Sequence, residues 1–165
     1  MHADKQLSRY FTRHQVIQGT ALPPDARQLN WKHFDDYLKL EEKYILLCQR
    51  LDDVILDINA KFIQNNYATL TLGVASGFRC LPWELKRNRS GHSQHTIGAA
   101  LDVYPVSNSL TDPQLFDVIQ YITGKYQKSW QGGFAVKAPV LQNGRLVSTG
   151  FIHFDNRQGN ARWTY

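Results

Sequence analysis

The 165-residue sequence predicts one α+β domain that combines an antiparallel sheet with a long N-terminal helix and a second helix. Three observations predict this class. Apolar residues between positions 34 and 62 recur at helical spacings. Apolar and β-branched runs at 70–76 and 99–104 are typical of strands. Asn143-Gly144, between two apolar runs, is the strongest short-range signal for a hairpin. We therefore expect residues 1–165 to form a single domain, with residues 1–30 as an N-terminal arm.

The N-terminal arm carries only short patterns. From Leu7 to Ile17 the sequence is compatible with one or two helical turns, which Gly19 would end. Pro23-Pro24-Asp25 predicts an extended turn, because proline fixes its own backbone angle and lacks the N–H group. We expect a structural role for this arm.

The long helix is predicted to begin near Trp31, with Asn30 as its N-cap. The spacing is compatible with a break near Leu40, and Asn65-Asn66 is expected to stop the helix. Its apolar positions are Phe34, Leu38, Ile45, Cys48, Leu51, Ile55, Ile58 and Phe62. Carboxylates are rarely buried unpaired, so a solvated outer face is expected for Asp35, Asp36, Glu41, Glu42, Asp52 and Asp53.

Two predicted strands flank a basic segment. The strand at 70–76 delivers Arg79 to the edge of a proposed cleft, and the polar stretch 81–91 is typical of a surface loop or short helix. The strand at 99–104 follows, and Pro105 is expected to close it.

The second helix is predicted to start at Thr111-Asp112-Pro113, because threonine caps helices and proline is tolerated in the first turn. It should end near Gly124, and Gly132-Gly133 interrupts the segment that follows. The apolar stripe of this helix is Leu115, Phe116, Ile119 and Ile122.

Charge and composition restrict the partners. The net charge of +5 and the pI of about 9.3 favour an anionic partner, either a nucleic acid or the anionic polymers of a bacterial envelope. Nucleic acid is disfavoured because the positive residues are scattered and no recognised binding motif is present. The N-terminus lacks an apolar signal-peptide core, and no run is long enough to cross a bilayer. We therefore expect synthesis in the cytoplasm and no membrane association.

Cys48 and Cys80 are predicted to be buried free thiols.

Three residues form a candidate metal site. His95 and Asp102 lie seven positions apart around a small-residue turn at Gly98, and His153 lies on a segment that alternates as a strand does. Neutral imidazole and carboxylate are both good ligands for Zn²⁺, and a catalytic zinc site uses three protein ligands with one open position. His92 is a rival ligand, which we interpret instead as a loop histidine.

The order of the motifs carries a resemblance. SGFR at 76–79, SQHTIGAALD at 93–102 and GFIHFD at 150–155, followed by ARW at 161–163, resemble the zinc D-alanyl-D-alanine carboxypeptidase family. That family includes phage and bacterial endopeptidases that cut peptidoglycan stem peptides, and the branch resembled has an HxD motif near its C-terminus. LSRYFT at 7–12 is more weakly similar to phage members. The resemblance implies a hedgehog/DD-peptidase-like fold, zinc bound by His95, Asp102 and His153, and substrate contacts from Arg79 and Ser93.

The general base is where the sequence departs from this pattern. Several branches of the family place Asp or Glu three residues before the last histidine, but Gly150 occupies that position here. Asp155 shares a predicted strand face with His153, so we expect it to be the catalytic base; the alternative is that it orients that histidine. Glu84 is the second candidate for the base.

These features predict a zinc metallopeptidase that hydrolyses peptidoglycan stems, as a D,D-carboxypeptidase or an endopeptidase such as a phage endolysin. It would act as a monomer on the bacterial cell wall, and the resemblance implies release during phage lysis as one route. The alternative is a non-catalytic cell-wall-binding or assembly protein that retains the fold. The sequence leaves open which peptidoglycan bond is cut and whether the source is a phage or a bacterium.

Overall fold

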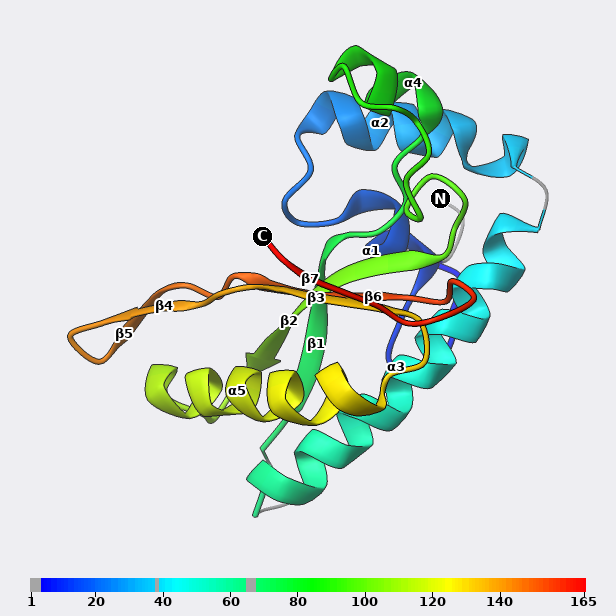
Figure 1. The fold of residues 1–165 in the computed structure, drawn as a ribbon. Helices are drawn as coiled ribbons and strands as arrows, with labels where there is room; N and C mark the ends of the chain where they lie inside the picture. Colours follow the sequence, from blue (N-terminus) through cyan, green and yellow to red (C-terminus); the bar gives the residue numbers. More distant parts are fainter. Residues whose placement is uncertain (1–3, 38, 65–67) are drawn as a thin grey trace.

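We describe the protein from a computed structural model, which covers residues 4–37, 39–64 and 68–165 (Figure 1). The helices, with η1 a single 3-10 turn, are α1 (Arg13–Gln18), α2 (Pro24–His33), η1 (Phe34–Asp36), α3 (Leu40–Phe62), α4 (Leu81–Lys86) and α5 (Asp112–Ser129). The strands are β1 (Leu70–Ser76), β2 (Ala100–Ser107), β3 (Gly133–Lys137), β4 (Val140–Gln142), β5 (Arg145–Ser148), β6 (Phe151–Asp155) and β7 (Ala161–Thr164). The α+β class predicted from the sequence is confirmed.

The main sheet is mixed, whereas the sequence predicted an antiparallel one. Its order is β1-β2-β6-β3-β7, and every neighbouring pair is antiparallel except β3 and β7. The exception has a topological cause. The chain reverses after β6, but both sides of β6 are already occupied by β2 and β3. Strand β7 therefore adds beyond β3, which runs in the same direction.

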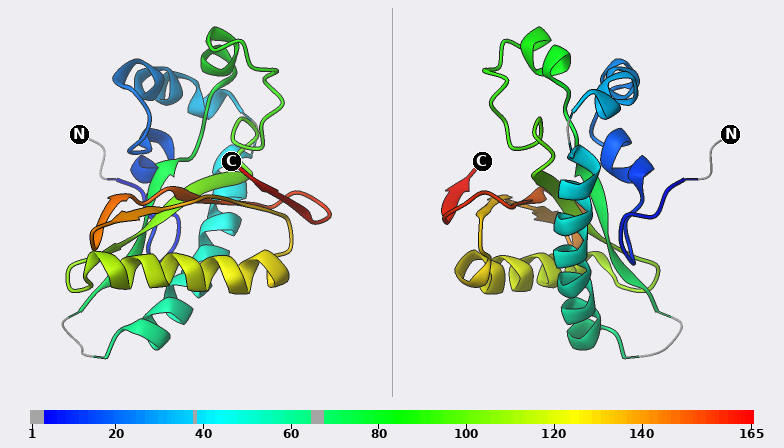
Figure 2. Two further views of the ribbon diagram at one scale, coloured as in Figure 1. Left: turned by 60° about the vertical axis from the view of Figure 1, so that its left-hand side comes forward. Right: turned by 90° about the vertical axis from the view of Figure 1, so that its right-hand side faces the viewer.

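Two helices cover one side of this sheet. Strands β1 and β2 contact α3, strands β2 and β3 contact α5, and the two helices contact each other. Figure 2 shows α5 below the sheet and the α4 segment above it. The core includes Leu51, Ile55 and Ile58 of α3 and Ile152 and Phe154 of β6, all at most 1% exposed. The apolar residues that recur at helical spacing in α3 and at alternate positions in β6 are thus the ones buried in this core.

The predicted long helix is broken near Leu40, as its spacing allowed, and its main part therefore begins later than predicted. Leu40 is its first residue, and Asn30 lies inside the separate helix α2 instead of capping α3. The Asn30 amide is fully buried, donates to the carbonyls of Ile17 and Phe78 and accepts from the Cys80 N–H. These partners are distant in sequence, so the local pattern gave no sign of them. Leu38 and Asn65-Asn66, which also entered this prediction, lie outside the described residues.

Other boundaries differ for local reasons. Pro24 starts α2 at its first turn, where a missing N–H costs nothing, so 23–25 is no extended turn. Strand β2 continues through Pro105. Its pairing with β6 ends at Val103, so Pro105 has no partner in β6 that would need the N–H group that proline lacks. Helix α5 passes through Gly124 to Ser129. The Thr111 cap and the hairpin around Asn143-Gly144 are confirmed.

The N-terminal residues belong to the core. Phe11, Val16 and Ile17 are fully buried, and the Phe78 N–H donates to the Val16 carbonyl. Asp52 of α3 is half-buried, contrary to the prediction of a solvated face, because it accepts hydrogen bonds from the Ser8 hydroxyl and the Arg9 N–H. The segment before α2 is therefore fixed to both β1 and α3.

Both cysteines are buried free thiols, as predicted. Within the described ranges, no helix combines the length and the apolar character needed to span a membrane.

Candidate metal centre

One row of side chains across the sheet positions most of the site. Asp102 of β2 and His153 of β6 are direct cross-strand partners, so their side chains leave the same face. The row continues to Ala135 of β3 and Trp163 of β7. Ala135 is small, and the His153 and Trp163 rings meet across it, with 5.0 Å between centroids. The register between β2 and β6 thus places a carboxylate beside an imidazole.

His95 reaches the same point from the loop before β2. Its Nδ1 lies 2.7 Å from the Gly77 carbonyl oxygen. A carbonyl can only accept, so Nδ1 carries the proton and Nε2 presents a lone pair to the site. Nε2 is buried and has no hydrogen-bond partner among the described residues. A buried acceptor such as His95 Nε2 is normally satisfied by a cation or by a hydrogen-bond donor.

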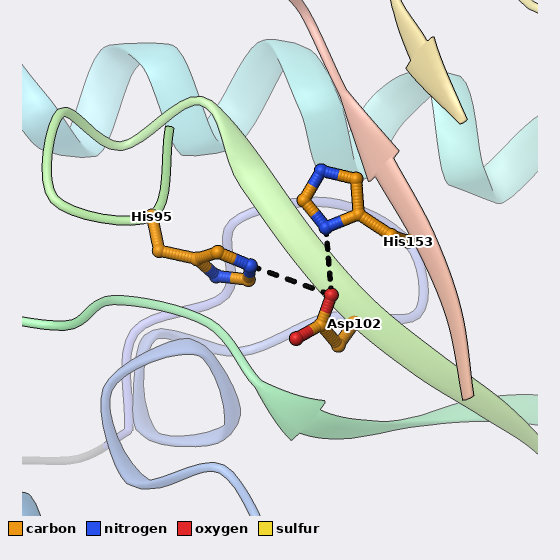
Figure 3. A group of neighbouring side chains, drawn as sticks. All are labelled: His95, Asp102 and His153. Carbon is orange, nitrogen blue, oxygen red and sulfur yellow. Dashed lines mark hydrogen bonds and ion pairs between the residues drawn. The ribbon is translucent and has the colours of Figure 1, made fainter. Parts of the chain in front are cut away.

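The three side chains converge on one point (Figure 3). Their ligand atoms lie within 4.8 Å of one another, and all three residues are buried. Asp102 Oδ1 lies 3.3 Å from His95 Nε2 and 2.7 Å from His153 Nδ1. Two acceptor atoms, His95 Nε2 and the carboxylate oxygen, face each other with no donor between them. A metal ion satisfies both, so this triad could hold a metal ion.

The protonation states fit this interpretation. Burial would raise the pKa of Asp102, but the neighbouring His95 and His153 outweigh it and hold the pKa well below its ordinary value. Burial lowers the pKa of His95 and so favours the neutral imidazole that metals bind. For His153, burial acts in the same downward direction, but hydrogen bonds to Asp102 and Asp155 raise its pKa. Between two carboxylates, His153 carries the proton that a metal would displace.

Asp155 lies behind His153, on the side away from Asp102. Its Oδ2 is 3.0 Å from His153 Nε2. The same carboxylate accepts from the Gly133 N–H at 2.6 Å and from the Arg157 backbone and guanidinium. Asp155 is fully buried. This arrangement suits a residue that orients His153, which is the alternative to the role of catalytic base that the sequence favoured for Asp155.

The Gly132-Gly133 pair makes room for this carboxylate. A Cβ atom on Gly133 would lie 2.2 Å from Asp155 Oδ2, far inside any normal contact distance. A side chain at position 133 would therefore displace Asp155 from His153. The doubled glycine was visible in the sequence, but its function as a close approach was not.

Arg79 and Ser93 are joined in the structure. Arg79 Nη2 donates to Ser93 Oγ at 2.9 Å, and Ser93 Oγ also accepts from the His95 N–H. Glu84 is 2% exposed and pairs with Arg79 at 3.3 Å and with Arg89 at 3.2 Å. The guanidinium of Arg79 is thus held beside the triad by a hydroxyl and a carboxylate.

A cleft of about 840 Å³ opens beside the triad. Of the residues predicted for the site, Arg79, Ser93 and Asp102 line it, and so do Glu84 and His92. His95, His153 and Asp155 do not line it. Sequence reasoning missed Lys137, Phe151 and Tyr165 in its lining and Arg157 behind Asp155. Strand alternation could have identified two of them. Phe151 lies two residues before His153, and its partner Lys137 lies two residues after Ala135, so both share the sheet face of His153.

Gly150 occupies the position where the resembled family carries its base. Its φ is +58°, and a Cβ atom there would lie 2.0 Å from the Lys137 carbonyl oxygen. The backbone of β3 therefore excludes any side chain at this position.

The chain matches no protein-family model, and searches of curated proteins and of solved structures likewise found no match.

Proposed function

We propose that this protein is a zinc metallopeptidase that hydrolyses the peptide stems of bacterial peptidoglycan. The observation that carries the proposal is the buried triad of His95, Asp102 and His153, whose ligand atoms converge without a proton donor for His95 Nε2. The order of the three sequence motifs, similar to that of the zinc carboxypeptidase family, supplies the substrate class.

The donor set supports zinc. Two imidazole nitrogens and one carboxylate oxygen suit Zn²⁺, and three protein ligands leave a position for water or substrate. Asp102 also lines the cleft, so the fourth position is expected to face it. When bound, zinc supplies a Lewis acid that polarises the scissile carbonyl and lowers the pKa of water.

The chain's own residues would bind and orient the substrate. Arg79 offers a planar pair of donors for a substrate carboxylate, and Ser93 and Glu84 hold it in place. Asp155 would keep the His153 ring oriented by accepting from Nε2. We therefore assign Asp155 as a positioning residue instead of the base.

A non-catalytic cell-wall-binding protein is the second candidate, and one observation favours it. Among the described residues, two carboxylates line the cleft, Asp102 and Glu84. Asp102 is a proposed metal ligand, and Glu84 is paired with two arginines. Neither is free to accept a proton, and a chain without such a group would bind stem peptides without cutting them.

Mass spectrometry of purified peptidoglycan after incubation with the protein separates the two candidates. We expect new stem fragments that a chelator abolishes and added zinc restores, and the fragment masses identify the bond. The His153→Ala variant should bind no zinc and release no fragments. If wild type loaded with one zinc per chain retains peptidoglycan but releases nothing, the peptidase proposal is wrong and the binding protein is supported.

A further inference from the structure

The cleft beside the triad has an excess of positive charge. Its carboxylates belong to Glu84 and Asp102, and its cationic side chains to Arg79, Arg87, Arg89 and Lys137. Four positive groups thus face two negative ones, before any divalent ion adds to the excess. A cleft lined mainly by one sign of charge concentrates ligands of the other sign. The surplus points to a substrate with more than one anionic group.

Arg79 marks one flank of the triad. It is linked through Ser93 to His95, the ligand contributed by the loop before β2. In Figure 3, His95 and His153 approach the same Asp102 oxygen from different directions, His95 from the loop before β2 and His153 from β6. The Arg79 guanidinium therefore belongs to the His95 flank.

Lys137 marks the opposite flank. It pairs across the sheet with Phe151, and both residues lie two positions along their strands from the row that contains His153 and Ala135. Two positions along a strand keep the same face and span about 7 Å, which a lysine side chain can bridge. Lys137 therefore reaches toward the cleft from the His153 flank.

Two aromatic residues, Phe151 and Tyr165, lie beside the Lys137 side chain. The ammonium lies 5.9 Å from the Phe151 ring centroid, and the Phe151 and Tyr165 rings are 4.8 Å apart. Cation–π attraction of this kind favours a position of the ammonium over the ring. Among the described residues, no carboxylate lies within ion-pair distance of Lys137, whereas Arg79 and Arg89 share Glu84. The Lys137 ammonium is available to a ligand.

We propose that Lys137 forms a second anion subsite, across the triad from Arg79, so that the cleft selects peptides with one carboxylate on each side of the scissile bond. The inference rests on the proposed function and narrows its substrate. A stem of L-Ala, γ-linked D-Glu, L-Lys and two D-Ala residues carries two such groups, the D-Glu α-carboxylate and the C-terminus. The scissile bond then lies between D-Glu and the C-terminal residue.

Four synthetic stem pentapeptides test this subsite, with D-Glu or D-isoglutamine combined with a C-terminal acid or amide. Binding to chelator-treated protein is measured by calorimetry, and kcat/KM is measured with the zinc-loaded enzyme. Wild type should bind the D-Glu peptide about tenfold more tightly than the D-isoglutamine peptide, since a charge-assisted hydrogen bond is lost. Lys137→Gln should abolish this preference and keep the preference for a free C-terminus.

Lys128→Gln, an exposed charge change on α5 away from the cleft, is the matched control and should behave as wild type. Equal binding of D-Glu and D-isoglutamine peptides by wild type overturns the subsite, as does an equal loss of affinity for all four peptides in Lys137→Gln. If the binding preference holds but no peptide is cut, the subsite stands and the peptidase proposal fails. If peptides are cut without the preference, the peptidase proposal stands and the subsite fails.

Discussion

Replacing Asp155 with asparagine separates a positioning residue from a base. The carboxylate accepts from five donor groups: the Gly133 N–H, the His153 ring and three N–H groups of Arg157. An amide has only one oxygen in place of two. Whichever way the new side chain turns, its NH₂ group faces at least one N–H donor that the carboxylate now satisfies.

The magnitude follows from this geometry. Removing one partner of a buried ion pair lowers the free energy of unfolding by about 3–5 kcal/mol. We expect a value of about 3 kcal/mol for Asp155 and Arg157, because the Arg157 side chain is 32% exposed and stays partly hydrated. Loss of the carboxylate behind a ligating histidine weakens metal binding by about 10–100-fold. We therefore expect Asp155→Asn to lose about 3 kcal/mol of unfolding free energy and to bind zinc at least about tenfold more weakly.

The assays are zinc competition against a chromogenic chelator, turnover on stem peptides, and urea unfolding. Asp117→Asn makes the same charge change on the exposed face of α5 and should leave all three unchanged. Unchanged zinc affinity with activity reduced about 100-fold or more would mean that Asp155 acts on the reacting atoms and would refute the positioning role.

Three further substitutions test separate parts of the structure. Gly150→Asp should lower the unfolding free energy by about 2 kcal/mol or more without raising activity, because the Lys137 carbonyl and the positive φ exclude a side chain; a variant as stable as wild type in urea would contradict this. Arg79→Lys should fold normally but lower kcat/KM on peptides with a free carboxylate by about tenfold, because lysine lacks the planar fork; unchanged kinetics would leave Arg79 only a structural role. Burial alone would raise the pKa of Asp57, but hydrogen bonds from Lys125 and two tyrosines of α5 lower it. A carboxylate with a depressed pKa stabilises the fold above its unfolded pKa of about 4, and this contribution is lost as the pH falls through the folded pKa. Asp57→Asn should therefore cost about 1 kcal/mol at pH 7 and progressively less as the pH falls below about 4, and a cost independent of pH would exclude the ionic contribution.

The grouping of His95, Asp102 and His153 was predicted from local signals together with the order of the motifs shared with the resembled family. His153 and Asp155 share a face by strand alternation, and the turn at Gly98 returns the chain to the strand that carries Asp102. The sequence favoured Asp155 as the base because it does not reveal the donors from Gly133 and Arg157 that hold this carboxylate, which are set by the sheet and by a turn after β6. Alternation predicts the direction of a side chain, but not what it meets.

The elements that were mispredicted depend on contacts between distant segments. Asn30 has the residue type of a helix cap, and only its burial against Ile17, Phe78 and Cys80 explains its place within α2. The parallel pairing of β7 depends on β3 having already occupied the place beside β6. Both features depend on contacts between segments that are far apart in the sequence. Residue propensity and hydrophobic periodicity describe only neighbouring residues and do not predict such contacts.

The register between β2 and β6 would make the candidate metal site a reporter of correct folding. A slip of one residue would turn Ile152 and Phe154 toward the ligands and His153 into the core. A chain in the wrong register cannot assemble the triad, so metal present during refolding would stabilise only the native pairing. The excursion through the hairpin of β4 and β5 begins and ends at the paired residues Lys137 and Phe151. Its length can therefore change without moving His153.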